Sequence, residues 1–228
     1  MNTAKTTPSE TTERDSYNAL TSYPLWVSTL VGRAGDAGTF TTGIETDRRG
    51  RGTAINVDVY GYDESQFLAV IQVRECRITK YGNSVRKDYY LLGYTERWTV
   101  FAHPIESPCR SRKIQTEPPE ATVRRVLARI WDCEEHQLDH IVRQGDVAFV
   151  PARLPRGSIE IDNQVTLRDT HKITGKIFRA PDDSLYCERA SMRHTKGQHR
   201  AVRVSGKIYR IQTGLRAKTW NFSAPTCD

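Results

Sequence analysis

Long apolar runs, a hydrophobic N-terminal segment and paired cysteines are all missing from this chain of 228 residues. No stretch approaches the roughly 20 apolar residues that a membrane-spanning helix needs, and nothing at the N-terminus has the apolar core of a signal peptide. The five cysteines are odd in number and form no C-x-x-C pair, which disfavours a disulfide framework and a structural zinc site. We therefore expect a soluble, cytoplasmic protein with reduced thiols and no bound cofactor.

Acidic side chains are missing from one long segment near the end of the chain. Residues 189–227 contain nine Lys or Arg and two His but no Asp or Glu. The formal net charge of the chain is +7, whereas the balance between Gln164 and Cys227 alone is +9, with 13 Lys and Arg against four acids. Cations in such number need water, acids from elsewhere or a polyanion as partner, and phosphates are the usual polyanionic partner of Lys and Arg.

The arrangement of apolar and turn-forming residues predicts a mainly β protein. We expect two β-rich modules, each a barrel or a roll, joined by a linker and a short helical segment. The predicted order is a disordered tail at residues 1–16, an N-terminal β domain at 17–105, a linker at 106–118, a helical segment at 119–142 and a C-terminal basic β domain at 143–228.

Individual elements follow from residue type and periodicity. Runs rich in Val, Ile, Thr and aromatic residues predict strands in the first half at Leu25–Val31, Gly38–Ile44, Thr53–Tyr60, Gln66–Val73, Tyr89–Leu92 and Arg97–Ala102. A helix is predicted from Pro119, with apolar residues at helical spacing, and a second short helix over Glu134–Val142. Strands are predicted in the second half at Val147–Val150, Val165–Leu167, Lys172–Arg179, Ser184–Cys187, Ala201–Val204 and Lys207–Thr213.

The densest group of chemically active side chains is the run from Arg193 to His199. It holds His194, Lys196 and His199, and His171 stands at the start of an earlier predicted strand. Three interpretations remain open: exposed polar residues on a basic surface, a general acid–base pair with Lys196 and Arg193 stabilising negative charge, or a three-His metal site. An offset of five places His194 and His199 on opposite faces of a regular strand, but Gly197 could bring them together. The distances between the three imidazoles would discriminate among these interpretations.

Further basic and aromatic residues extend the candidate binding surface. Arg49 and Arg51 belong to an arginine–glycine loop that suits contacts with phosphates or bases. Tyr89 and Tyr90, close to Arg86 and Lys87, are a candidate platform for base stacking. The remaining candidate contacts to nucleic acid lie in the acid-free segment and are Arg193, Arg200, Arg203, Lys207, Arg210 and Arg216.

One stretch of the second half resembles a known group of proteins. The run Arg143-Gln144-Gly145-Asp146 followed by Val147–Pro151 resembles the opening strand of small uncharacterised bacterial and phage β proteins. Those proteins carry a later His near a Thr-Gly turn and then a closely spaced His pair, which here match His171 with Thr174-Gly175, and His194 with His199. The resemblance covers residues 143–213 and implies a compact β domain in a microbial or mobile-element setting, without an activity.

Together these features predict a nucleic-acid-associated protein that binds RNA or single-stranded DNA. It either binds only, or is also a metal-independent phosphodiesterase that uses His194, His199 and Lys196, with His171 as a third candidate. A second interpretation is an accessory or assembly subunit that docks on an acidic protein or a ribonucleoprotein. The third is a hydrolase with a His-bound metal. The sequence alone leaves open whether the protein is an enzyme.

Overall fold

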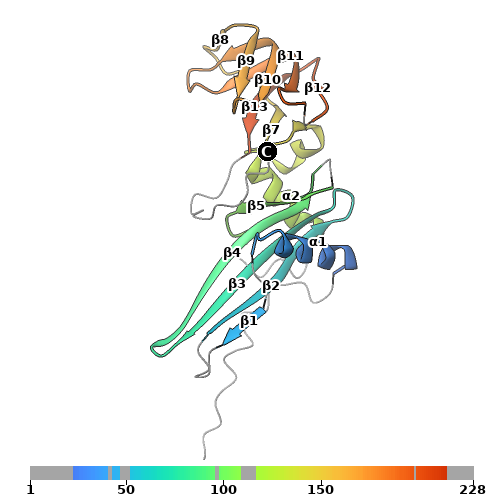
Figure 1. Ribbon diagram of the computed structural model, residues 1–228. Coiled ribbons are helices and arrows are strands. Elements are labelled where there is room, and N and C mark those ends of the chain that lie inside the picture. The colour runs from blue at the N-terminus through green and yellow to red at the C-terminus, as the bar shows by residue number, and fades with distance from the viewer. Residues whose placement is uncertain are drawn as a thin grey trace, which may run out of the picture. The chain divides into compact units, whose positions relative to one another are not determined.

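A computed structural model describes residues 23–40, 43–46, 52–95, 98–108, 117–197 and 199–214. The predicted tail, most of the predicted linker, and Arg49, Arg51 and Arg216 lie outside the described residues. The protein is mainly β, as predicted, and the chain divides into two compact units (Figure 1). The described part of the first unit runs from residue 23 to Tyr94 and over Val100–Val123, and that of the second contains Thr95–Thr99 and the residues from Arg124 onward.

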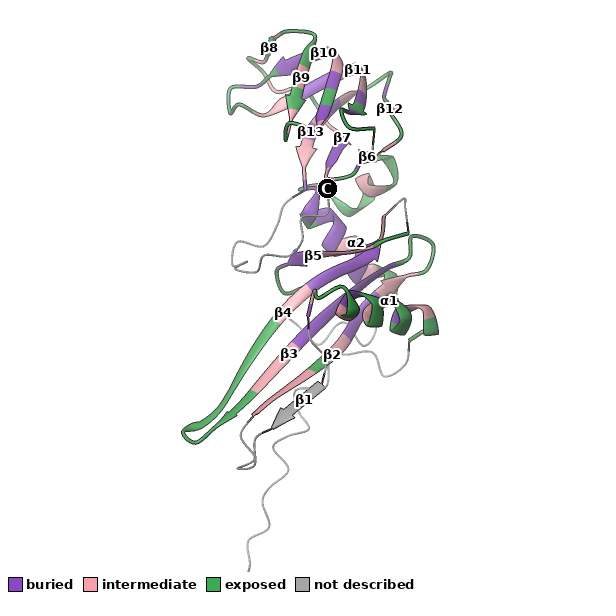
Figure 2. Ribbon diagram, viewed as in Figure 1, coloured by how far each residue is buried: buried purple, intermediate pink, exposed green. Residues whose placement is uncertain are grey.

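The first unit is built on an antiparallel sheet with the strand order β1-β2-β3-β4-β5. Its elements are α1 (Leu25–Asp36), β1 (Gly43–Thr46), β2 (Gly52–Asp63), β3 (Leu68–Thr79), β4 (Gly82–Tyr94), β5 (Val100–Ile105) and the start of α2 (Pro119–Ile130). The buried half of β3 is the continuous run from Leu68 to Val73, and that of β4 runs from Tyr90 to Gly93, so both faces of these strand halves are covered. Their outer halves carry polar and charged residues and are exposed, which Figure 2 shows in green.

Helix α1 corrects the prediction of a strand at Leu25–Val31. The stretch contains the β-branched residues Val27, Thr29 and Val31, which favoured a strand. The buried residues are Val27, Leu30 and Ala34, spaced three and four apart, which is the repeat of a helix that packs one side against a sheet. The helical period therefore outweighs the local β propensity.

The first turn of α2 packs against β2 at Gly61. A Cβ on Gly61 would lie 2.5 Å from the carbonyl oxygen of Pro119 and 2.7 Å from Cβ of Thr122. Only glycine permits so close an approach of helix and strand. The predicted helix beginning at Pro119 is confirmed, with Val123 and Val126 buried.

The second unit contains an eight-stranded antiparallel sheet with the path β6-β7-β13-β11-β10-β8, in which β12 pairs with β11 and β9 with β10. Its elements after α2 are a 3₁₀ helix (Glu135–His140), β6 (Val142–Gln144), β7 (Val147–Pro151), β8 (Ile159–Glu160), β9 (Gln164–Leu167), β10 (His171–Arg179), β11 (Leu185–His194), β12 (Val202–Arg203) and β13 (Ile208–Thr213). Phe149, Ile173, Ile177 and Met192 are fully buried and form the centre of its core. The described sheet does not close into a barrel.

Candidate functional site

Strands β10 and β11 position the candidate site through their register. His171 lies directly opposite His194, and Lys172 lies directly opposite Arg193. Successive side chains of a strand point to opposite faces, so the two imidazoles share one face and the two cations share the other. His171 and His194 are 3% and 4% exposed, while Lys172 and Arg193 are exposed. The same two rungs thus hold a buried histidine pair and an outer cationic pair.

The three histidines named in the sequence come together as one cluster, which we call the histidine cluster (His171, His194 and His199). The ring centroids are 4.9 Å apart for His171 and His194, 5.2 Å for His194 and His199, and 6.4 Å for His171 and His199. The rings of His171 and His199 are nearly parallel, and the ring of His194 is almost perpendicular to that of His171. Of the three interpretations left open by the sequence, that of exposed residues on a basic surface does not fit His171 and His194, which are buried.

Hydrogen bonds place the proton of His171 on Nδ1. The hydroxyl of Thr170 donates to the carbonyl of Arg168 at 3.1 Å, so its oxygen accepts from Nδ1 of His171, also at 3.1 Å. A carboxylate oxygen of Asp146 lies 3.8 Å from the same nitrogen, and Arg168 pairs with Asp146 at 2.9 Å. The lone pair of His171 is thus on Nε2, which is buried and has no hydrogen-bond partner among the described residues.

Burial lowers the pKa of His171 below its ordinary value of 6.5. The Asp146 carboxylate acts in the opposite direction, and the imidazoles of His194 and His199 lower the pKa further. The charged form of a buried imidazole loses its hydration, and two neighbouring rings that can also become cationic add to that cost. His171 is therefore a neutral, structural histidine near pH 7.

His194 and Lys196 are linked through the backbone. The main-chain N–H of Lys196 donates to Nδ1 of His194 at 3.2 Å, so the neutral ring carries its proton on Nε2. The side chain of Lys196 is exposed, whereas the ring of His194 is buried. A phosphodiester that reaches Lys196 would not reach His194 in this arrangement.

Gly145 and Gln144 connect the histidine cluster to the rest of the second unit. Gly145 has a φ of +58°, and a Cβ there would lie 3.1 Å from Nε2 of His199 and 3.5 Å from Nε2 of His171. The amide of Gln144 donates to the carbonyl of Arg200 at 2.6 Å and so fixes the loop that carries His199. The Gln-Gly-Asp stretch of the sequence therefore forms the base under the cluster.

A metal centre does not follow from the convergence of the imidazoles. Within the described residues, no three His, Cys, Asp or Glu side chains are placed so that they could hold a metal ion. Nδ1 of His194 already accepts a hydrogen bond, and its protonated Nε2 has no lone pair to offer. The cluster is instead a group of three closely packed imidazole rings.

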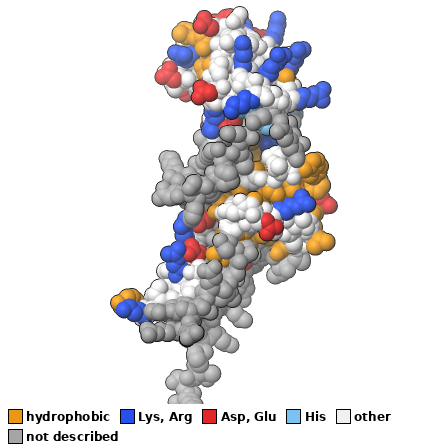
Figure 3. Space-filling model, viewed as in Figure 1, with side chains coloured by type: hydrophobic (Ala, Val, Ile, Leu, Met, Phe, Trp, Pro, Cys, Tyr) orange, Lys and Arg blue, Asp and Glu red, His pale blue; other side chains and the backbone are white. Residues whose placement is uncertain are grey.

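Exposed cations of these strands and of the loops on either side of β12 form a group that we call the basic face (Lys172, Arg193, Lys196, Arg200, Arg203 and Lys207). Arg203 of β12 lies opposite Ser191, two residues from Arg193, and so points to the same side as Lys172 and Arg193. Lys196 and Arg200 are exposed in the loop before β12, and Lys207 is exposed in the loop after it. In Figure 3, most of the Lys and Arg side chains visible on this unit lie on the right, and several acidic side chains lie on the left.

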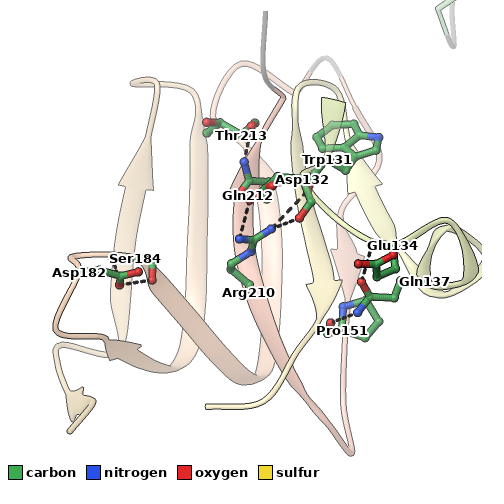
Figure 4. Close-up of polar contacts among 10 residues, drawn as sticks. All are labelled: Trp131, Asp132, Glu134, Gln137, Pro151, Asp182, Ser184, Arg210, Gln212 and Thr213. Atoms are coloured by element: carbon green, nitrogen blue, oxygen red, sulfur yellow. Dashed lines mark hydrogen bonds and ion pairs between the residues drawn. The ribbon is translucent and has the colours of Figure 1, made fainter. Parts of the chain in front are cut away.

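Arg210 does not belong to the basic face, contrary to the prediction. Its guanidinium contacts the carboxylate of Asp132 at 2.8 Å and the main-chain carbonyl of Asp132, and the side chain is 23% exposed (Figure 4). A pocket of about 340 Å³ lies beside this ion pair and includes Cys133. Burial raises the pKa of the Cys133 thiol, which keeps it protonated and poorly nucleophilic. Arg210 thus stabilises the second unit.

Tyr89 and Tyr90 are not a stacking platform, so that prediction is also wrong. Tyr90 is 3% exposed, and burial raises its pKa to about 12. The hydroxyl of Tyr89 accepts a hydrogen bond from the amide of Gln72 at 2.7 Å and its ring packs edge-on against Tyr60. Tyr90 lies in the core of the first unit, and Tyr89 is half-buried beside it.

Sequence reasoning missed Lys172 as a partner of Arg193, and Asp146 with Arg168 as supports of His171. The sequence contained a signal for Lys172: it directly follows His171 in a predicted strand, so the two side chains point to opposite faces. The ion pair between Asp146 and Arg168 joins residues far apart in the sequence and gave no local pattern.

No family model, curated protein or solved structure matches the chain. The resemblance of residues 143–213 to small bacterial and phage proteins therefore stays a prediction. Among the described helices, none is long and apolar enough to cross a membrane.

Proposed function

We propose that the protein binds RNA or single-stranded DNA through the basic face of its second unit. The observation that carries the proposal is the rung formed by Lys172 and Arg193, two like charges directly opposite each other on an exposed sheet surface. Like charges in this position destabilise a sheet. A bound phosphate would remove the repulsion and release counterions.

The cations of the basic face differ from those elsewhere in the same sheet. Lys176, four residues along β10, pairs with Glu160 at 3.6 Å and with Glu188 at 4.0 Å. No described acidic side chain forms an ion pair with Lys172, Arg193 or Arg203. The basic face thus keeps its charge available for an external anion.

The neighbours of these cations favour contacts with the nucleic-acid backbone. Thr174 and Ser191 lie on the same side and hydrogen-bond to each other at 2.9 Å. The described residues of this side include hydroxyl and amide groups but no exposed aromatic ring. Contacts from Lys, Arg and hydroxyl groups position a phosphate chain without reading its sequence. We therefore expect weak sequence preference.

Cleavage is not part of the proposed function, because His171 and His194 are buried beneath the rung that would contact the substrate. A general acid or base must come within hydrogen-bonding distance of the reacting atoms. The histidine cluster supports the face instead: it holds the ends of β10 and β11, and Gln144 and His194 fix the loop that bears Lys196 and Arg200.

The test compares three forms of the full chain by fluorescence anisotropy with labelled 20-nucleotide RNA and single-stranded DNA. In the double variant Lys172→Gln/Arg193→Gln, affinity should fall and the log–log dependence on salt should become less steep by about 1.4, because two phosphate contacts are lost. Lys176→Gln is the matched control, since it removes an exposed charge that already has acidic partners. It should bind like the wild type.

Equal affinity of the double variant and the control would refute the proposal. Competition with polyglutamate distinguishes nucleic-acid binding from docking on an acidic protein. If polyglutamate displaces RNA at comparable charge concentration, the face accepts acidic protein as readily as nucleic acid, and an accessory subunit becomes the better interpretation.

A further inference from the structure

The first unit has an exposed two-stranded projection, which is separate from the basic face of the second unit. We call residues 74–88 the arm; it consists of the outer ends of β3 and β4 and the turn between them (Figure 1). The buried half of each strand lies at the other end, where α1 packs, and the residues from Arg77 to Lys87 are all exposed. The arm holds five Lys or Arg and two acidic residues.

One rung of the arm repeats the arrangement of the basic face. Arg74 of β3 lies directly opposite Lys87 of β4, and Asn56 of β2 lies opposite Arg74 on the other side. The three side chains therefore stand in a row on one face of the sheet, with neighbouring strands about 4.8 Å apart. Each of them can donate hydrogen bonds to an anion.

Within the described part of the chain, the cations of this rung form no ion pair, unlike those on the opposite face of the arm. Arg77 pairs with Glu75, and Arg86 pairs with Asp88 at 3.0 Å. Among the described residues, no acid pairs with Arg74 or Lys87, and Nε of Arg74 is buried without a hydrogen-bond partner. Two opposed like charges and an unsatisfied guanidinium nitrogen make this face of the arm complementary to a negative group.

The turn of the arm presents an aromatic ring to solvent. Tyr81 is 87% exposed, and the ammonium group of Lys80 lies 4.6 Å from the centre of its ring. About 17 Å of strand separate Arg74 from the turn, at 3.3–3.4 Å per residue. A single strand of several nucleotides could therefore contact both sites at once.

We propose that the arm is a second binding site for single-stranded nucleic acid, in which Arg74 and Lys87 contact phosphates and Tyr81 stacks on a base. The combination of unpaired cations and an exposed ring is the pair of features that single strands use, since every base has a stacking surface and every nucleotide a phosphate. The carboxylates of an acidic protein would pair with the cations but would offer Tyr81 no planar aromatic group on which to stack. The site does not depend on the basic face, because its residues belong to the other unit.

The first test is specific to stacking. Single-stranded RNA of 20 nucleotides containing 2-aminopurine is titrated with the full chain, and the fluorescence of the base analogue is measured together with anisotropy. The wild type should quench the fluorescence, Tyr81→Phe should quench it to the same extent, and Tyr81→Ala should lose the quenching and about tenfold in affinity. Tyr23→Ala removes another partly exposed tyrosine of the first unit and should behave like the wild type.

The second test concerns charge. Lys87→Gln should reduce affinity, whereas Arg77→Gln, which removes a cation that is already paired with Glu75, should not. These substitutions lie on exposed strand ends, so the thermal unfolding midpoint serves to show that each variant is folded. Equal binding by the wild type, Tyr81→Ala and Lys87→Gln, or no binding by the wild type, would overturn the proposal.

Combining the variants separates this site from the basic face. If Lys172→Gln/Arg193→Gln leaves binding unchanged while Tyr81→Ala abolishes quenching, the arm is the site and the proposed function of the basic face fails. If Tyr81→Ala is silent while the double variant binds weakly, the basic face stands and the arm proposal fails. If polyglutamate displaces the RNA but Tyr81→Ala still weakens RNA binding and abolishes quenching, stacking is supported. If polyglutamate displaces the RNA and Tyr81→Ala changes neither affinity nor quenching, stacking is contradicted.

Discussion

At the scale of single residues, two histidines of the second unit have opposite environments. His171 is buried against the core and faces Thr170, Asp146 and two imidazoles, while His136 is exposed on the 3₁₀ helix. The sequence indicated that His171, His194 and His199 form a group but not that it is buried. Burial of His171 and His194 depends on the register between β10 and β11, and the five-residue spacing of His194 and His199 in the sequence carries no information about that register.

Stability should depend on pH through His171. Because the pKa of His171 is lowered in the folded protein, the unfolded chain binds more protons as the pH falls below about 6.5. The contribution of His171 to the free energy of unfolding should be nearly constant well above pH 6.5 and should decrease as the pH falls from there toward pH 5. Urea unfolding at several pH values measures the slope, which His171→Gln should reduce and His136→Gln should leave unchanged. An identical slope in both variants would contradict the assignment.

Gly145 should be sensitive to a single added methyl group. Gly145 and Gly197 both have positive φ, at +58° and +65°, so alanine costs about 1 kcal/mol at either position. A Cβ on Gly197 meets nothing within 4 Å, whereas one on Gly145 meets the rings of His199 and His171. Gly145→Ala should therefore lower the free energy of unfolding by about 1–3 kcal/mol more than Gly197→Ala. Equal losses would mean that the cluster does not pack against Gly145.

At the scale of elements, prediction from sequence succeeded where a single period dominates. The apolar repeat of Val123, Val126 and Leu127 gave the helix from Pro119, and the alternation in β10 and β13 gave two strands of the second unit. It failed at α1, where β-branched residues occupy a helix, and at β6 and β8, which are too short to show a period. These elements form because tertiary packing supplies what the local pattern does not.

Helix α1 can be tested at Gly32. This residue is exposed in the helix interior, and a Cβ there would meet nothing within 4 Å. Gly32→Ala should raise the free energy of unfolding by about 0.5–1 kcal/mol, and Gly32→Val should raise it less, because valine has the lower helix propensity. A strand would reverse the order, since valine is favoured over alanine in strands. Thermal or urea unfolding of the two variants decides between them.

At the scale of the whole molecule, the charge asymmetry in the sequence has a structural counterpart. The acid-free segment supplies five of the six cations of the basic face, and β10 supplies the sixth, Lys172. The sequence could predict this surplus of cations and most of its members. It could not predict that Arg210 is used internally by Asp132, because that contact spans two distant parts of the chain.

The salt dependence of binding to single-stranded RNA tests the central claim most directly. The six cations of the basic face should neutralise about six phosphates, so by themselves they should give the logarithm of the binding constant a slope of about −4 against the logarithm of salt concentration, and phosphate contacts to the arm would make the slope steeper. Anisotropy of labelled RNA with the full chain between about 50 and 200 mM salt gives this slope. A slope of about −4 or steeper that becomes less steep by about 1.4 in Lys172→Gln/Arg193→Gln is the predicted result. A flat dependence, or a slope that the double variant leaves unchanged, would contradict nucleic-acid binding by the basic face.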